Sequence, residues 1–274
     1  MNVLITGGAG GIGEAIARVF AEGGYDLILQ YNKSEEAASK LKAELESAYN
    51  IKVLPIKADL TSTEEIEVLS RKALDEFGAI DVLINNAGIA HQELFQLCSD
   101  EKVKEVFDIN IMSMMKLTKE ILPSMIKNHS GRIINISSMW GICGASCEVH
   151  YSASKAAVIG FTKALSKEVG PSGITVNCIA PGFIDTKMNA HLSEDDVKEI
   201  VDCTPMMRKG TGDDVAYLAE FLASEKAGFI TGQVISVDGG YAVYIDPSVT
   251  TFGCDISPFR GDKAKLLKKI NVSF

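Results

Sequence analysis

The chain has 274 residues, of which 46% are hydrophobic and 24 are glycines, so it can bury a sizeable core and make many turns. Its formal net charge of −9 argues against a surface that binds nucleic acid or an anionic membrane. No apolar run approaches the length that spans a bilayer. Strand-like residues begin at Asn2 and leave no room for a signal peptide, so we expect a soluble, cytoplasmic protein. The six cysteines lack metal-ligand spacing, so we expect free thiols and no metal site.

Short apolar runs alternate along the chain with longer amphipathic ones. Runs typical of buried strands lie at 2–6, 25–31, 51–58, 80–84, 131–137, 173–180 and 233–238. Stretches typical of helices lie at 12–24, 34–48, 62–78, 99–127, 150–169 and 212–224. Because this alternation gives parallel strands covered by helices on both faces, we predict a single doubly wound (Rossmann) α/β sheet. Ligands of such sheets bind at the carboxyl ends of the strands.

A glycine-rich loop, TGGAGGIG, follows the first predicted strand and opens the first helix. Its G-x-G-x-x-G spacing is typical of dinucleotide sites, because glycines let the backbone approach a pyrophosphate at a helix N-terminus. The loop alone is a weak signal, and its place between strand and helix strengthens it. The predicted binding residues are Thr6, Gly7, Gly8, Gly10, Gly11, Ile12 and Gly13.

The end of the second predicted strand is where a dinucleotide site reads the adenosine ribose. NAD enzymes usually place Asp or Glu there. This chain has Tyr31, Asn32, Lys33 and Ser34 instead, and no carboxylate. A cation beside small donors suits a 2′-phosphate, which favours NADP(H) over NAD(H). An ordinary polar loop with a solvated Lys33 is the alternative.

Two further segments follow the third and fourth predicted strands. Asp59 could accept a hydrogen bond from an adenine amino group, and Leu60 comes directly after it. Small and amide residues of NNAG could line the cofactor. These residues are Asn86, Ala87 and Gly88. Each segment alone could equally be turn chemistry.

A set of polar residues indicates catalysis of proton transfer. Tyr151 and Lys155 are one helical turn apart, and Ser138 ends the fifth predicted strand. Asn110 is the one polar member of an apolar stripe on the helix over 99–127, and a buried amide needs partners. The alternatives are a surface pair for Tyr151 and Lys155 and a core residue for Asn110.

In order along the chain, these motifs resemble those of the short-chain dehydrogenase/reductase family. The resemblance runs from residue 2 to about 241 and includes TGGAGGIG, NNAG, Asn110, Ser138, YSASK and PGFIDT (181–186). Each motif is weak alone, whereas the ordered set is highly specific. IINISS, ITVNCIAPGFIDTKM and FLASEKAGFITGQVISVDGGY are most similar to the 3-oxoacyl-[acyl-carrier-protein] reductase branch. The resemblance implies an NADP-binding domain over residues 1–241.

The resemblance also implies a role for each catalytic residue. Tyr151 would protonate the carbonyl oxygen as hydride arrives at carbon, and Ser138 would hold that oxygen. Lys155 would lower the pKa of Tyr151 and hold the nicotinamide ribose. Asn110 would hold a water that links Lys155 to solvent.

After the sixth predicted strand, the resemblance implies further contacts with the nicotinamide. The residues concerned are Pro181, Gly182, Ile184 and Thr186. Residues 187–208 would form a substrate lid that excludes water.

The function implied is NADPH-dependent reduction of a carbonyl to a secondary alcohol, with a 3-oxoacyl thioester of fatty acid biosynthesis favoured. A dehydrogenase of a sugar alcohol, small ketone or hydroxysteroid is an alternative. A non-catalytic NADP sensor is less favoured, because the catalytic set is complete. The family also implies a homotetramer or homodimer. Loops 127–131 and 170–173 offer few basic residues to a carrier protein, so coenzyme A thioesters stay open as substrates.

Residues 242–274 extend beyond the usual end of the family. From Tyr241 onward there are five basic and three acidic residues, a net charge of +2 against −11 for the body. Residues 262–270 could form an amphipathic helix. We expect an arm that packs on a neighbouring subunit, with a loosely ordered extension as the alternative.

Overall fold

The computed structural model describes residues 1–186, 189 and 192–244. In this part of the chain, seven parallel strands form one sheet in the order β3-β2-β1-β4-β5-β6-β7. The strands are β1 (Asn2–Ile5), β2 (Asp26–Tyr31), β3 (Val53–Lys57), β4 (Val82–Asn85), β5 (Gly131–Ile136), β6 (Ile174–Pro181) and β7 (Val234–Val237). The doubly wound parallel sheet predicted from the sequence is therefore confirmed. Its strand order reverses between β1 and β4, which is where such sheets open a ligand crevice.

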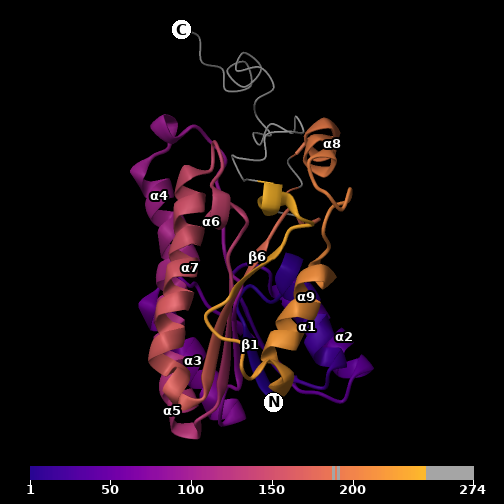
Figure 1. Cartoon of the computed structure of the whole chain (residues 1–274). Coiled ribbons are helices and arrows are strands. Elements are labelled where there is room, and N and C mark those ends of the chain that lie inside the picture. The colour runs from indigo at the N-terminus through magenta and orange to yellow at the C-terminus, as the bar shows by residue number, and fades with distance from the viewer. Residues whose placement is uncertain (187–188, 190–191, 245–274) are drawn as a thin grey trace.

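Helices cover both faces of the sheet. The α-helices are α1 (Gly11–Glu22), α2 (Glu35–Ala48), α3 (Thr63–Phe77), α4 (Asp100–Phe107), α5 (Ser113–Asn128), α6 (Trp140–Cys143), α7 (Val149–Val169), α8 (Glu194–Asp202) and α9 (Gly212–Ala223). Short 3-10 turns lie at Phe95–Leu97, Gly170–Ser172, Glu225–Ala227 and Tyr241–Tyr244. Figure 1 shows α1, α2 and α9 on one side of the sheet and α3, α4, α5 and α7 on the other.

Two large apolar cores and a smaller one hold these layers to the sheet in the described part of the chain. Phe20 of α1 and Leu222 of α9 are fully buried in the first core. Leu69 of α3 and Ile121 of α5 are fully buried in the second. The strands are apolar on both sides because each side meets a helix layer, as expected for a parallel sheet.

The single helix predicted over residues 99–127 is wrong in its middle. Helix α4 ends at Phe107, a π-helical turn covers Asp108–Met112, and α5 begins at Ser113. Such wide turns recur at functional sites. Asn110 lies within this turn, where its side chain bonds to a neighbouring loop and to α7. Apolar periodicity does not report this change, because the chain stays helical throughout.

The predicted lid over residues 187–208 contains a helix that the periodicity did not indicate. In α8, Ser193 and Asp196 form a reciprocal capping box. The sequence SEDD carries that signal.

The C-terminal extension lies almost entirely outside the described residues. That is true of the helix expected at 262–270, so the division at residue 241 and the inter-subunit arm stay predictions. Among the described helices, none combines the length and apolar character needed to cross a membrane.

Candidate active site

A cavity of about 680 Å³ opens at the carboxyl ends of the strands. This volume suits a cofactor together with a small substrate. The glycine loop, the NNAG segment, the end of β5, the start of α7 and the segment after β6 all contribute to its walls. Segments far apart in the sequence therefore meet at one site, as the sheet topology predicted.

The glycine loop leaves room for a ligand at the start of α1. Gly7 and Gly11 have φ angles of 62° and 53°, a region that L side chains rarely adopt. A Cβ on Gly13 would lie 2.2 Å from the Gly7 carbonyl oxygen, so loop and helix can pack this closely only with glycine. Gly10 caps α1 without a side-chain bond and has no neighbour in the space that a Cβ would enter. The loop therefore fits a pyrophosphate at the helix N-terminus.

Gln30 of β2 organises the glycine loop, a role that sequence reasoning missed. Its Oε1 accepts from the Gly7 N–H at 2.8 Å, and its Nε2 donates to the Ala58 carbonyl oxygen at 2.8 Å. The side chain is buried, and both ends of its amide are used. A polar residue near the end of an apolar strand was the available signal.

Thr6 joins the glycine loop to the NNAG segment. Its hydroxyl oxygen accepts from the N–H groups of Asn86 and Ala87, each at 2.9 Å. Asn86 returns a bond from Nδ2 to the Thr6 carbonyl oxygen at 2.9 Å. These bonds fix two predicted cofactor segments against each other.

The predicted ribose-binding residues lie at the end of β2, outside the walls of the main cavity. Asn32, Lys33 and Ser34 are exposed. Hydrogen bonds from Thr61 lower the pKa of Asp59, and the nearby charge of Lys33 lowers it further. Lys33 and Asp59 are thus brought together, as the topology predicts.

Four predicted nicotinamide contacts lie at the end of β6 and in the segment that follows it. Pro181, Gly182, Ile184 and Thr186 all line the cavity. Thr186 approaches the glycine loop, since a Cβ on Gly11 would lie 3.6 Å from its Cγ2. A Cβ on Gly182 would lie 2.6 Å from the Cα of Asp238, so only glycine fits there. Leu60 instead lines a small separate cavity beside Thr6 and Asn110.

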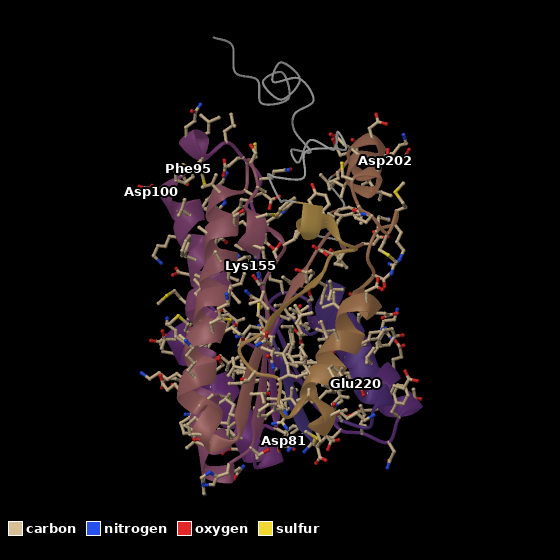
Figure 2. The ribbon with its side chains drawn as sticks, in the orientation of Figure 1. Asp81, Phe95, Asp100, Lys155, Asp202 and Glu220 are labelled. Carbon is tan, nitrogen blue, oxygen red and sulfur yellow. The ribbon has the colours of Figure 1, made fainter. Side chains whose placement is uncertain are left out.

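Ser138, Tyr151 and Lys155 converge on the cavity. Ser138 hydrogen-bonds the phenol of Tyr151 and accepts from the Trp140 N–H at 3.2 Å. Lys155 Nζ donates to the Ile136 carbonyl oxygen at 3.0 Å. Figure 2 labels Lys155 on α7, in the interior between the two helical layers. The sequence interpretation of a surface pair is thereby excluded, since both side chains are buried.

Burial dominates the acid–base properties of this pair. It raises the pKa of Tyr151 to about 12, against a smaller lowering by Ser138. It lowers the pKa of Lys155 to about 8. We expected Lys155 to lower the pKa of Tyr151, but in the protein without cofactor the effect of burial is larger and the pKa is raised. The reason is that both groups lose solvation, which disfavours phenolate and ammonium alike.

Asn110 has the partners that a buried amide requires. Its Oδ1 accepts from the Ile89 N–H at 2.8 Å, and its Nδ2 donates to the Ile89 carbonyl oxygen at 2.9 Å and to Ser154 Oγ at 3.0 Å. Ser154 in turn donates to the Tyr151 carbonyl oxygen at 2.7 Å. Asn110 therefore ties the loop after β4 to the helix that carries Tyr151. The sequence indicated Ser154 only as a small residue.

Glu148 is a cavity residue that sequence reasoning did not single out. It directly precedes α7 and lines the cavity with Tyr151. Burial raises its pKa from 4.5 to about 7. Glu148 and Tyr151 therefore face the same cavity.

The described residues contain no cluster of three or more potential metal ligands. Within the same residues, the cysteines are free thiols. Cys254 lies outside the described residues, and the absence of a metal site stays a prediction.

Comparisons with known proteins agree with this geometry. The family model for short chain dehydrogenase matches residues 1–197. A 3-oxoacyl-[acyl-carrier-protein] reductase FabG of Chlamydia muridarum is 43% identical over 239 residues, covering 87% of this chain and 96% of that protein. An uncharacterized oxidoreductase, YmfI, of Bacillus subtilis is 40% identical over 240 residues, covering 88% and 98%. Nodulation protein G of a Rhizobium species is 40% identical over 242 residues, covering 88% and 97%.

The fold, the site and these matches define an NAD(P)-dependent oxidoreductase. The chain belongs to the short-chain dehydrogenase family.

Proposed function

We propose that the chain is an NADPH-dependent carbonyl reductase that forms secondary alcohols. The observation that carries this proposal is the convergence of Ser138, Tyr151 and Lys155 on the cavity that the glycine loop also lines. The name of the Chlamydia muridarum relative makes 3-oxoacyl thioesters the first substrate class to test. The alternative is an NAD(P)-dependent dehydrogenase of a sugar alcohol, small ketone or hydroxysteroid.

A bound nicotinamide dinucleotide supplies the hydride. Ser138 holds the carbonyl oxygen, and Tyr151 donates its proton to that oxygen as negative charge develops there. The phenol is protonated throughout the neutral range, since its pKa is about 12. It is still a stronger acid than the alcohol it forms, so the transfer is downhill.

Lys155 and Asn110 support this proton donor. With a pKa of about 8, Lys155 is mostly charged at neutrality and becomes neutral by losing one proton. It can therefore both stabilise a transient phenolate and return a proton to it. Asn110 holds α7 against the loop after β4, which keeps Tyr151 in place.

NADP(H) is favoured over NAD(H) by the end of β2. Lys33 is exposed there beside Asn32 and Ser34, and its charge reaches Asp59 across the strand ends. Tyr31 completes the proposed site, in which the ammonium group of Lys33 would bind the 2′-phosphate.

The proposal is tested by following NADPH oxidation with a short 3-oxoacyl thioester beside a small ketone, a sugar and a steroid. Turnover of any of these supports the reductase. Tight NADPH binding with no turnover of any carbonyl compound would instead support a sensor. The homotetramer or homodimer implied by the family is tested separately, by light scattering of the full chain.

A further inference from the structure

The carboxylate of Glu148 has no evident structural role. It precedes α7 but does not cap that helix through its side chain. Among residues 1–186, 189 and 192–244, no hydrogen bond or ion pair to this carboxylate is found, and burial alone perturbs it. Glu148 is half-buried in the cavity wall, where a bound ligand would cover its carboxylate. A carboxylate that loses its water in this way needs a partner, and the ligand can supply it.

Three basic side chains of this region already have partners. His91 lines the cavity, but its Nε2 lies 3.2 Å from Glu105 Oε2. Lys102 pairs with Glu93 at 2.9 Å. Lys155 donates to the Ile136 carbonyl oxygen. His150, two residues further on, has an Nε2 without a hydrogen-bond partner, and burial lowers the pKa of its ring, which disfavours a positive charge there. Within the described part of the chain, no basic group forms an ion pair with Glu148.

The backbone holds Glu148 in a defined place. Its carbonyl oxygen accepts from the Ser152 N–H at 2.8 Å, and the Ser152 hydroxyl accepts from the Ala145 N–H at 3.1 Å. The Glu93 N–H donates to the Cys147 carbonyl oxygen at 2.9 Å, which ties the preceding residue to another loop. These bonds fix the backbone of Glu148 at the cavity wall.

Glu148 is also close to the reacting centre. Its charge raises the pKa of Tyr151, which places the two groups within electrostatic reach of each other. Trp140 lines the same cavity, and an aromatic face attracts cations. A substrate held at Tyr151 therefore extends past a carboxylate and an indole.

We propose that Glu148 is a specificity-determining residue that binds a protonated amine on the carbonyl substrate, so that amino ketones are preferred to neutral ketones and neutral acyl thioesters. This inference rests on the proposed carbonyl reductase activity and narrows its substrate class. A bound substrate with a neutral group beside Glu148 would cover the carboxylate and leave it unpaired, whereas a substrate ammonium group would neutralise it.

The test compares matched ketones with the full chain and NADPH. One series of methyl ketones carries a dimethylammonium group two or three methylenes from the carbonyl. In the isosteric series, CH replaces the charged N–H. At pH 8 we expect wild-type kcat/KM to favour the charged ketone by at least about tenfold, chiefly through KM. In Glu148→Gln this ratio falls to about one, since the shape is kept and the charge is lost.

Three controls separate charge recognition from structure. Glu148→Asp keeps the charge and retains part of the preference. Glu93→Gln removes a carboxylate that Lys102 already occupies, so the wild-type ratio is kept. Lowering the pH through 7 protonates Glu148 and reduces the preference in wild type but not in Glu148→Gln. Melting temperatures of the variants establish that each is folded.

The outcomes separate a failure of the amine-binding role from a failure of the proposed carbonyl reductase activity. A wild-type enzyme that reduces both ketones equally, or a Glu148→Gln variant that keeps the preference, overturns the amine-binding role alone. Absence of turnover with every ketone and thioester overturns the reductase function and this inference with it.

Discussion

Lys155 Nζ lies 5.7 Å from the centroid of the Tyr151 ring and donates a hydrogen bond to the Ile136 carbonyl oxygen at 3.0 Å. The amine therefore lies between the end of β5, whose backbone accepts its hydrogen bond, and the aromatic ring of Tyr151. Because both side chains are buried, each is sensitive to the charge of the other and of any ligand that enters the cavity.

Tyr151→Phe should lower kcat by about 100-fold to 10,000-fold, because it removes the proposed proton donor. NADPH binding, followed by the fluorescence of the dinucleotide, should be nearly unchanged because the ring remains. Turnover close to the wild-type rate would show that another group supplies the proton.

Lys155→Met should abolish most turnover and yet stabilise the cofactor-free protein near pH 7. Its folded pKa of about 8 lies below the ordinary 10.5, so the stability linked to this lysine is present above pH 10.5 and lost as pH falls through 8. We expect a gain of about 1–3 kcal/mol in unfolding free energy at pH 7.

Urea titrations of both proteins at pH 7 and at pH 10.5 measure this effect. The difference between variant and wild type should shrink at the higher pH. A Met variant that is less stable than wild type at pH 7 would show that the charged amine stabilises the fold.

Gly13→Ala should destabilise the protein by about 1–3 kcal/mol and weaken NADPH binding, because an added Cβ would collide with the Gly7 carbonyl oxygen. Gly10→Ala is the matched control for stability, since nothing lies within 4 Å of its added Cβ. Equal losses of unfolding free energy in the two variants, measured by urea denaturation, would contradict the close packing of loop and helix.

Lys33→Ala should reduce the preference for NADPH over NADH by about tenfold, the value of one charge-assisted contact of about 1.4 kcal/mol. The readout is the ratio of kcat/KM for the two cofactors with one carbonyl substrate. Lys40→Ala removes another exposed lysine, on α2, and should leave the ratio at the wild-type value. A preference that survives the loss of Lys33 would assign 2′-phosphate recognition to other residues.

Glu148→Gln should stabilise the cofactor-free protein in a pH-dependent way. The folded pKa of about 7 exceeds the ordinary 4.5, so the stability linked to this carboxyl is fully present below pH 4.5 and lost as pH rises through 7. Above pH 8 the variant should be more stable by about 1–3 kcal/mol, and the difference should vanish near pH 4.5. Unfolding curves at pH 5 and pH 8 measure it, and a constant difference would mean that folding does not shift the pKa of Glu148.

The site could be predicted from sequence wherever its chemistry is local. Tyr151 and Lys155 share a helix face because they are four residues apart, and the glycines from Gly7 to Gly13 share one turn. The sequence also predicted that these segments meet, because parallel strands place their carboxyl ends at one edge.

The sequence did not predict the hydrogen bonds between residues that are far apart in the chain. Gln30 supports Gly7 from 23 residues away, and Asn110 bonds Ser154 across 44 residues. Nothing in the residues near Gln30 or Ser154 reports these partners. The π-helical turn around Asn110 could not be predicted either, because the apolar stripe of the helix continues through it.

Order along the chain was sufficient for the strands, most of the helices and the family, because hydrophobic period and turn chemistry act over a few residues. The protonation of Tyr151, Lys155 and Glu148 was decided by the folded molecule alone. A pKa depends on the solvation and the charges around a group, and packing of distant segments sets both.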